Sequence, residues 1–165
     1  MARHYPLARG WERQLDIAYD PIFYSEPLTE HSYHAWLTAN GVAFVALPDA
    51  RLDDSSLGER ALLERGLPYL RPVWHDAHWR VWRVESFRGL VDRDAEMLRL
   101  SPDGFTLRMT HAGDVAVRVR ATRHWRVRGG GCADRTDDGW TVLRNLPSGI
   151  VDVTQSLNGT PCPRP

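Results

Sequence analysis

Apolar residues in the first half of the chain recur with the period of an α-helix in two places. Tyr33 and Leu37 share one face of a helix expected over residues 29–39, and the Asn-Gly pair that follows is a common helix end. Ser56 and Glu59 stand at capping-box spacing before a second apolar pair, and this segment also ends at a glycine. The pattern therefore predicts two amphipathic helices.

Strand-like runs precede and follow the second of these helices. Residues 42–47 are continuously apolar, which is typical of a strand buried on both faces of its sheet. Residues 69–74 and 79–85 are rich in strand formers and flank a short polar segment, so they predict a hairpin. Together these elements predict a small α/β module over residues 1–88, in the order helix, strand, helix and hairpin.

From about residue 95 the apolar positions alternate with polar ones, which is the period of a half-buried β-strand. Gly, Pro and Asp interrupt this alternation at a spacing of roughly 8 to 12 residues, which favours a small antiparallel β-sandwich. We therefore expect residues 89–165 to form a β-sandwich subdomain. Packed with the first module as one globular unit, it places the chain in the α+β class.

The charges of the chain are balanced. Its 165 residues include 21 basic and 21 acidic side chains, so a nucleic-acid partner gripped by bulk charge is not expected. Seven tryptophans are present, and their broad rings suit cores, sugars and partner surfaces alike. No segment approaches the ~18 apolar residues of a membrane span, and the N-terminus lacks the apolar run of a secretion signal. As written, the sequence predicts neither a transmembrane segment nor export.

Cys132 and Cys162 are the only cysteines, and neither a CxxC pair nor a histidine at zinc-finger spacing suggests a zinc site. A disulfide between them would close a loop of about 30 residues and stabilise the fold by ~3–4 kcal/mol in the loop-entropy model. It would also hold a proline-rich tail that otherwise frays. The alternative is a reducing compartment in which both cysteines are free thiols that only fill space.

Two histidine pairs have spacings that can chelate a metal. His31 and His34 lie three residues apart on the first helix, and His75 and His78 flank the expected hairpin turn. A metal site needs a third and usually a fourth ligand, and nothing in the sequence brings the pairs together. We therefore expect solvated histidines, no bound metal and no other cofactor.

Six arginines occupy the polar positions of the second-half strands. Such a set forms either a basic stripe for phosphate oxygens or a solvated sheet face balanced by acids, and the zero net charge favours the solvated face. The six are Arg99, Arg108, Arg118, Arg120, Arg126 and Arg128.

The sequence contains no GxSxG, HExxH or Walker motif, so no catalytic residue is assigned. The densest polar and aromatic chemistry lies near the N-terminus. There, Trp11 can stack on a sugar ring while Glu12, Arg13 and Asp16 bond its hydroxyls. The alternative is an amphipathic turn that anchors the indole and solvates the charges.

Several segments resemble the soluble C-terminal, extracytoplasmic region of large actinobacterial multi-pass membrane proteins of the GT-C glycosyltransferase-like type. The resemblance covers nearly the whole chain. The segments are 8–16, 21–24, 36–37, 41–42, 45–49, 66–70, 73–74, 79–81, 125, 132 and 139–141.

The resemblance implies a domain outside the cytoplasmic membrane, beside a lipid-linked sugar site formed by transmembrane helices. A disulfide is compatible with that compartment. The catalytic acid of such transferases lies in an early loop that this chain does not contain, so none is carried over. Family members also have many upstream spans, whereas this chain begins at Met1 without one.

The sequence thus predicts a non-catalytic accessory domain that orients an acceptor glycan or a partner, with the transmembrane portion of a membrane protein as its own partner. A ligand-free structural or protein-interaction module is the alternative. A small metal-dependent enzyme using the histidine pairs is a more distant one.

Overall fold

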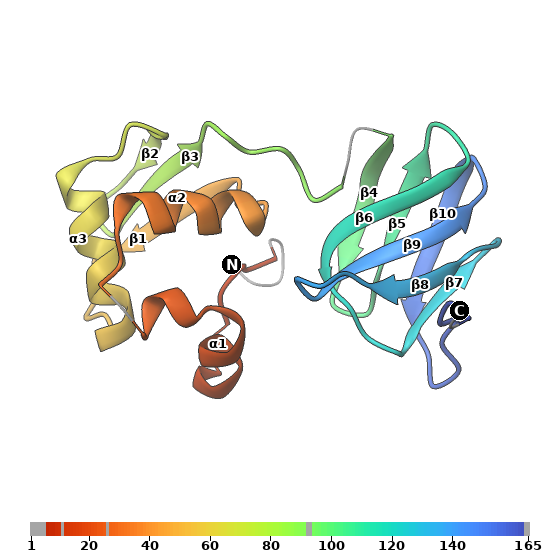
Figure 1. The fold of residues 1–165 in the computed structure, drawn as a ribbon. Coiled ribbons are helices and arrows are strands. Elements are labelled where there is room, and N and C mark those ends of the chain that lie inside the picture. The colour runs from red at the N-terminus through yellow and green to blue at the C-terminus, as the bar shows by residue number, and fades with distance from the viewer. Residues whose placement is uncertain (1–5, 11, 26, 92–93, 164–165) are drawn as a thin grey trace. The chain divides into compact units, whose positions relative to one another are not determined.

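The computed structural model describes residues 6–10, 12–25, 27–91 and 94–163. The chain divides into two compact units, Met1–Phe87 and Arg88–Pro165 (Figure 1). The first unit mixes helices with a small sheet, and the second is built from strands. The predicted α+β class with a β-sandwich is therefore confirmed.

Three α-helices lie in the first unit: α1 (Arg13–Tyr19), α2 (Glu30–Ala39) and α3 (Leu57–Arg65). None of the helices in the described part of the chain is long and apolar enough to cross a bilayer. Helix α1 was not predicted from the sequence, which suggested either a ligand site or an amphipathic turn for this segment.

Helix α2 is capped at both ends by its own residues. Thr29 accepts a hydrogen bond from the backbone N–H of Ser32 at 3.1 Å, and the Ser32 hydroxyl accepts one from the Thr29 N–H at 3.1 Å. At the other end Gly41 adopts φ 61°, which lets the next N–H bond the Leu37 carbonyl at 2.9 Å. Local sequence therefore sets the length of this helix.

The capping box predicted before α3 is wrong. Ser56 makes no side-chain cap, and the Asp53 carboxylate instead accepts the Ser56 N–H at 3.0 Å within a short 3₁₀ turn (Asp54–Ser56). Glu59 does not reach back to the cap because its carboxylate bonds Tyr33 and Arg9. The spacing of Ser56 and Glu59 fits a capping box, but the Glu59 side chain bonds residues that are distant in the sequence instead.

The sheet of the first unit contains β1 (Phe44–Pro48), β2 (Leu70–His75) and β3 (Trp79–Val84) in the antiparallel order β1-β3-β2. Its inner face packs on α2 and α3 through Val45, Leu47 and Val84, which meet Tyr33 and Leu37 in one core. The expectation that residues 42–47 are buried on both faces is wrong. The helices cover one face only, so Phe44 is 56% exposed while Val45 is 6% exposed.

The second unit pairs a four-stranded antiparallel sheet with a three-stranded one (Figure 1). Their side chains alternate between core and solvent, and the inner faces form one apolar core. The four-stranded sheet has the order β4 (Ala95–Ser101), β5 (Gly104–Met109), β10 (Gly149–Gln155), β7 (Trp125–Arg128). The three-stranded sheet has the order β6 (Gly113–Arg120), β9 (Trp140–Leu146), β8 (Cys132–Arg135).

The polar atoms buried in this core all find partners inside the second unit. The Trp125 indole N–H donates to the Thr141 hydroxyl and to the Arg120 carbonyl, both at 3.1 Å. Thr141 in turn donates to the Val119 carbonyl at 2.8 Å, and the Trp125 ring meets Phe105 edge-on at 5.4 Å. Because nothing polar is left unpaired at this position, the tryptophan contributes its full apolar area to the core.

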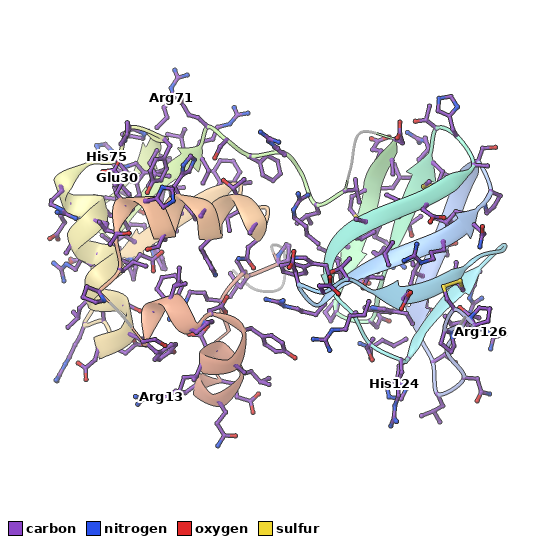
Figure 2. The ribbon with its side chains drawn as sticks, viewed as in Figure 1. Arg13, Glu30, Arg71, His75, His124 and Arg126 are labelled. Atoms are coloured by element: carbon purple, nitrogen blue, oxygen red, sulfur yellow. A yellow bond between two sulfur atoms is a disulfide. The ribbon has the colours of Figure 1, made fainter. Side chains whose placement is uncertain are left out.

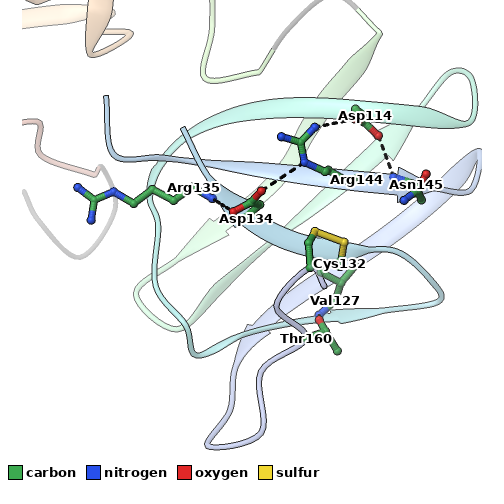
Figure 3. The surroundings of a disulfide bond; sticks show 9 residues. Asp114, Val127, Cys132, Asp134, Arg135, Arg144, Asn145 and Thr160 are labelled. Atoms are coloured by element: carbon green, nitrogen blue, oxygen red, sulfur yellow. Dashed lines mark hydrogen bonds and ion pairs between the residues drawn. A yellow bond between two sulfur atoms is a disulfide. The ribbon is translucent and has the colours of Figure 1, made fainter. Parts of the chain in front are cut away.

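The C-terminal segment joins the edges of the two sheets, and the predicted disulfide between Cys132 and Cys162 is present (Figure 3). Thr160 donates its N–H to Trp125 of β7, accepts the Val127 N–H on its hydroxyl, and accepts the Ala133 N–H of β8 on its carbonyl, each at 2.8 Å. The tail therefore closes the sandwich between β7 and β8, and the disulfide holds it there.

Replacing both cysteines by serine should lower the free energy of unfolding of the second unit by about 3–4 kcal/mol, because the unfolded chain regains the entropy of the closed loop. Chemical denaturation followed by the fluorescence of Trp125 measures the loss. Reduced wild type should match the double variant. A change below about 0.5 kcal/mol in both would contradict a stabilising role for the bond.

Candidate functional site

The four residues predicted to bind a glycan are not presented together by the structure. Trp11 lies outside the described residues. Glu12 and Arg13 are exposed at the start of α1, where the Glu12 carbonyl accepts the first helical hydrogen bonds. Figure 2 shows Arg13 at the surface of the first unit. Asp16 is buried, with 3% of its side chain exposed, and its carboxylate points into the unit rather than to solvent.

The Asp16 carboxylate belongs to a buried polar network. It accepts hydrogen bonds from the Arg9 guanidinium at 2.7 Å and from the Tyr24 hydroxyl at 2.6 Å. Arg9 lies over the Phe23 ring at 3.8 Å and reaches Glu59 of α3 at 3.5 Å. The network thus ties the N-terminal segment to α3, which is a structural role.

The pKa values of the two carboxyl groups in this network, Asp16 and Glu59, are shifted in opposite directions. Burial works against ionisation of Asp16, but the bonds from Arg9 and Tyr24 outweigh it and hold its pKa below the usual value. Burial dominates at Glu59 and raises the pKa of its carboxyl, although Tyr33 and Arg9 both donate to it. Burial and the charge of Glu59 likewise raise the pKa of the Tyr33 phenol.

The histidine pairs do not meet. His31 is exposed, while His34 is half-buried, stacks on Tyr69 at 4.1 Å and lies with its Nε2 3.0 Å from the Ser86 hydroxyl. His75 and His78 are exposed on β2 and the following turn. Within the described ranges no three His, Cys, Asp or Glu side chains converge on a metal position.

An open groove of about 590 Å³ runs beside His34 and Tyr69, between the start of α2 and the chain after β3. Tyr69 donates its hydroxyl to the Glu30 carbonyl at 2.9 Å, and burial raises the pKa of Tyr69 to about 12. Among the residues the structure describes, no carboxylate bonds the second nitrogen of His34, so the His34–Ser86 contact lacks the third member of a catalytic triad. The groove is lined by Glu30, His31, His34, Pro68, Tyr69, Glu85 and Ser86.

The six arginines of the second unit are divided between its two sheets. Arg99, Arg108, Arg126 and Arg128 belong to the four-stranded sheet, and Arg118 and Arg120 to the other. Acids alternate with them, since Arg108 pairs with Glu96 at 2.6 Å and Asp152 faces Arg128 across the strands. The positions are those of a mixed, solvated surface rather than one continuous basic stripe.

The uncovered side of the first sheet carries an apolar surface that sequence reasoning missed. Three rows of side chains cross its strands: Phe44, Arg83 and Arg71; then Ala46, Val81 and Trp74; then Pro48 and Trp79. We call this set of eight residues the outer sheet face.

The outer sheet face is open to solvent at its aromatic corners. Phe44 is 56% and Trp74 is 52% exposed, while Val81 and Trp79 of the central strand are half-buried. Exposed aromatic side chains on one face of a sheet make this face a candidate binding surface. The signal in the sequence was the presence of arginines at positions 71, 80 and 83 within β2 and β3, which a sheet covered on both faces would not tolerate.

Comparison of the chain with protein-family models, with curated proteins and with solved structures found no match. The likeness to GT-C-type membrane proteins therefore remains a prediction from the sequence.

Replacing Asp16 by Asn should lower the free energy of unfolding near pH 7 by about 3 kcal/mol, because a buried guanidinium loses its main partner. Because the pKa of Asp16 is lowered in the folded protein, the ionised carboxylate stabilises the fold at neutral pH. This contribution to the free energy of unfolding is lost as pH falls through the folded-state pKa. The variant should therefore show a shallower loss of stability on acidification in urea denaturation.

The matched control is Glu64→Gln, which removes the exposed ion pairs with Arg60 of α3 and Arg80 of β3 and should leave the free energy of unfolding nearly unchanged. Equal costs for the two variants, or an unchanged acid slope in Asp16→Asn, would contradict the network's role.

Proposed function

We propose that this chain is a non-catalytic glycan-binding module that acts on the extracytoplasmic side of a membrane. The observation that carries the proposal is the outer sheet face, where Phe44 and Trp74 expose more than half of their surface on a rigid three-stranded sheet. Sugar rings pack their C–H faces on aromatic side chains, and a sheet holds such side chains in fixed positions.

The dimensions of the outer sheet face suit an oligosaccharide. Phe44 lies on β1 and Trp74 on β2, with β3 between them. Two strand spacings across the sheet and one row of about 7 Å along it place these positions about 12 Å apart. A ligand that contacts both rings must therefore extend over more than one sugar, which fits a polymeric acceptor better than a monosaccharide.

The disulfide supports the proposed compartment. Cys132 and Cys162 are joined, which is compatible with an oxidising extracytoplasmic location. Together with the sequence resemblance, this favours an accessory domain of a GT-C-like membrane protein, whose transmembrane portion would supply the transferase chemistry. In that arrangement the module orients the acceptor glycan.

The alternative, a ligand-free scaffold, finds support in another tryptophan. The Trp36 indole is half-buried, donates to Asp20 at 2.8 Å and meets the Phe23 ring edge-on at 5.0 Å, as a packing residue does. Trp74 has no such surroundings, since half of its surface remains exposed. The exposed tryptophan favours ligand binding over a purely structural role.

Saturation-transfer NMR with arabinan, mannan and galactan fragments tests the proposal on the full chain. Wild type should transfer magnetisation to at least one glycan, and Trp74→Ala should weaken that binding about fivefold to tenfold by removing one stacked ring. Leu57→Ala is the control, since Leu57 is 50% exposed on α3, the helix that covers the opposite face of the sheet. No transfer to any fragment, or equal loss in both variants, would overturn the proposal.

A further inference from the structure

Two arginines of the outer sheet face stand directly opposite each other. Arg71 of β2 and Arg83 of β3 are cross-strand partners, and both side chains are exposed. Figure 2 shows Arg71 extending outward from the first unit. None of the three strands contains Asp or Glu, and no carboxylate of the described residues forms an ion pair with either arginine.

The arrangement is unfavourable in the free protein. Like charges at directly opposite positions of an antiparallel pair repel each other and destabilise the sheet. The other arginine of β3, Arg80, lies on the opposite face of the sheet and has partners there. Its guanidinium lies 3.7 Å from the Glu64 carboxylate and 5.5 Å from the centre of the Trp82 ring. Arg80 therefore has an acidic partner on α3, whereas the described residues supply none for Arg71 and Arg83.

We infer that the ligand of the outer sheet face is an anionic glycan, in which a uronate carboxylate binds between Arg71 and Arg83 while neighbouring sugar rings stack on Phe44 and Trp74. The inference rests on the proposed glycan-binding function and names its substrate class. A carboxylate accepts paired hydrogen bonds from the planar guanidinium, and one anion between two guanidinium groups removes their repulsion.

The positions of the rings fit this assignment. Arg83 lies between Phe44 and Arg71 in one row of the face, and Trp74 occupies the next row, paired with Val81. On β3 one row is two residues, about 7 Å, and on β2 a register shift after Pro72 brings Trp74, three residues after Arg71, into the next row. A sugar stacked on either aromatic side chain therefore holds a ring-borne carboxylate, its own or its neighbour's, within reach of the arginine pair.

A carboxylated glycan is favoured over the other polyanions that arginine and aromatic rings can bind. Single-stranded nucleic acid would use the same stacking and charge. However, the balanced net charge and the disulfide point away from a nucleic-acid protein and a reducing compartment. An anionic membrane surface is bound by clusters of several basic residues, whereas this face presents two.

The test compares two oligosaccharides that differ only at C6: a β-1,4-linked mannuronate tetramer and the matching β-1,4-linked mannose tetramer. Titration calorimetry on the full chain should give at least about tenfold tighter binding for the mannuronate, and this preference should shrink as salt rises from about 20 mM to about 300 mM. Arg71→Gln and Arg83→Gln should each abolish the preference for the mannuronate over the mannose tetramer.

Arg65→Gln, an equal charge change at an exposed position of α3, is the control and should keep the preference. Thermal unfolding checks the fold, because removing one of two repelling charges should leave the free Arg71 and Arg83 variants at least as stable as wild type.

Each outcome is decisive. Equal affinity for the two tetramers would overturn the anionic assignment but leave glycan binding intact. If the chain binds neither tetramer and none of the arabinan, mannan and galactan fragments, the proposed function itself is overturned. Tighter, Arg71-dependent binding of an oligothymidylate or of phosphatidylglycerol vesicles would replace the glycan by nucleic acid or by a membrane.

Discussion

Helices α2 and α3 pack on one face of a three-stranded sheet, and no helix or strand described in the first unit packs on its other face. Side chains of a strand alternate between the two faces of its sheet. Because Val45 and Leu47 face the helices, Phe44 and Ala46 must lie on the opposite face. Exposed apolar area forgoes about 25 cal/mol per Å² that burial would contribute. The large aromatic residues at these positions are the basis of the proposed ligand-binding surface.

The two units use different means to hold their edges. In the first, buried polar bonds from Arg9 fasten the N-terminal segment to Asp16 and Glu59. In the second, a short tail fills the gap between two sheet edges and Cys162 locks it to Cys132. Both devices fix chain segments that would otherwise fray, and the second requires an oxidising environment to form.

The features that the sequence predicted well are those with a local signal. Alternation after residue 95 was enough for the β-sandwich, because each of its strands keeps one face in the core and one in water. Thr29 and the Asn-Gly pair marked the ends of α2, because caps depend on neighbouring residues. Two isolated cysteines sufficed for the disulfide.

The predictions from the sequence were wrong where contacts with residues distant in the chain determine the structure. The run 42–47 is apolar on both faces, and only the position of the helices shows that one face is open. Glu59 had the spacing of a capping residue but bonds Tyr33, a partner on another helix. Asp16 looked like a sugar ligand because nothing in its own segment showed that Arg9 and Tyr24 bury its carboxylate.

The central claim is that the outer sheet face is open in the free protein and covered by its ligand. Hydroxyl-radical footprinting with mass spectrometry measures this residue by residue. The account predicts rapid oxidation of Phe44 and Trp74 in the free chain, slow oxidation of the buried Trp125, and protection of the first two when a bound glycan is present. Oxidation of Trp74 as slow as that of Trp125 in the free chain would contradict it.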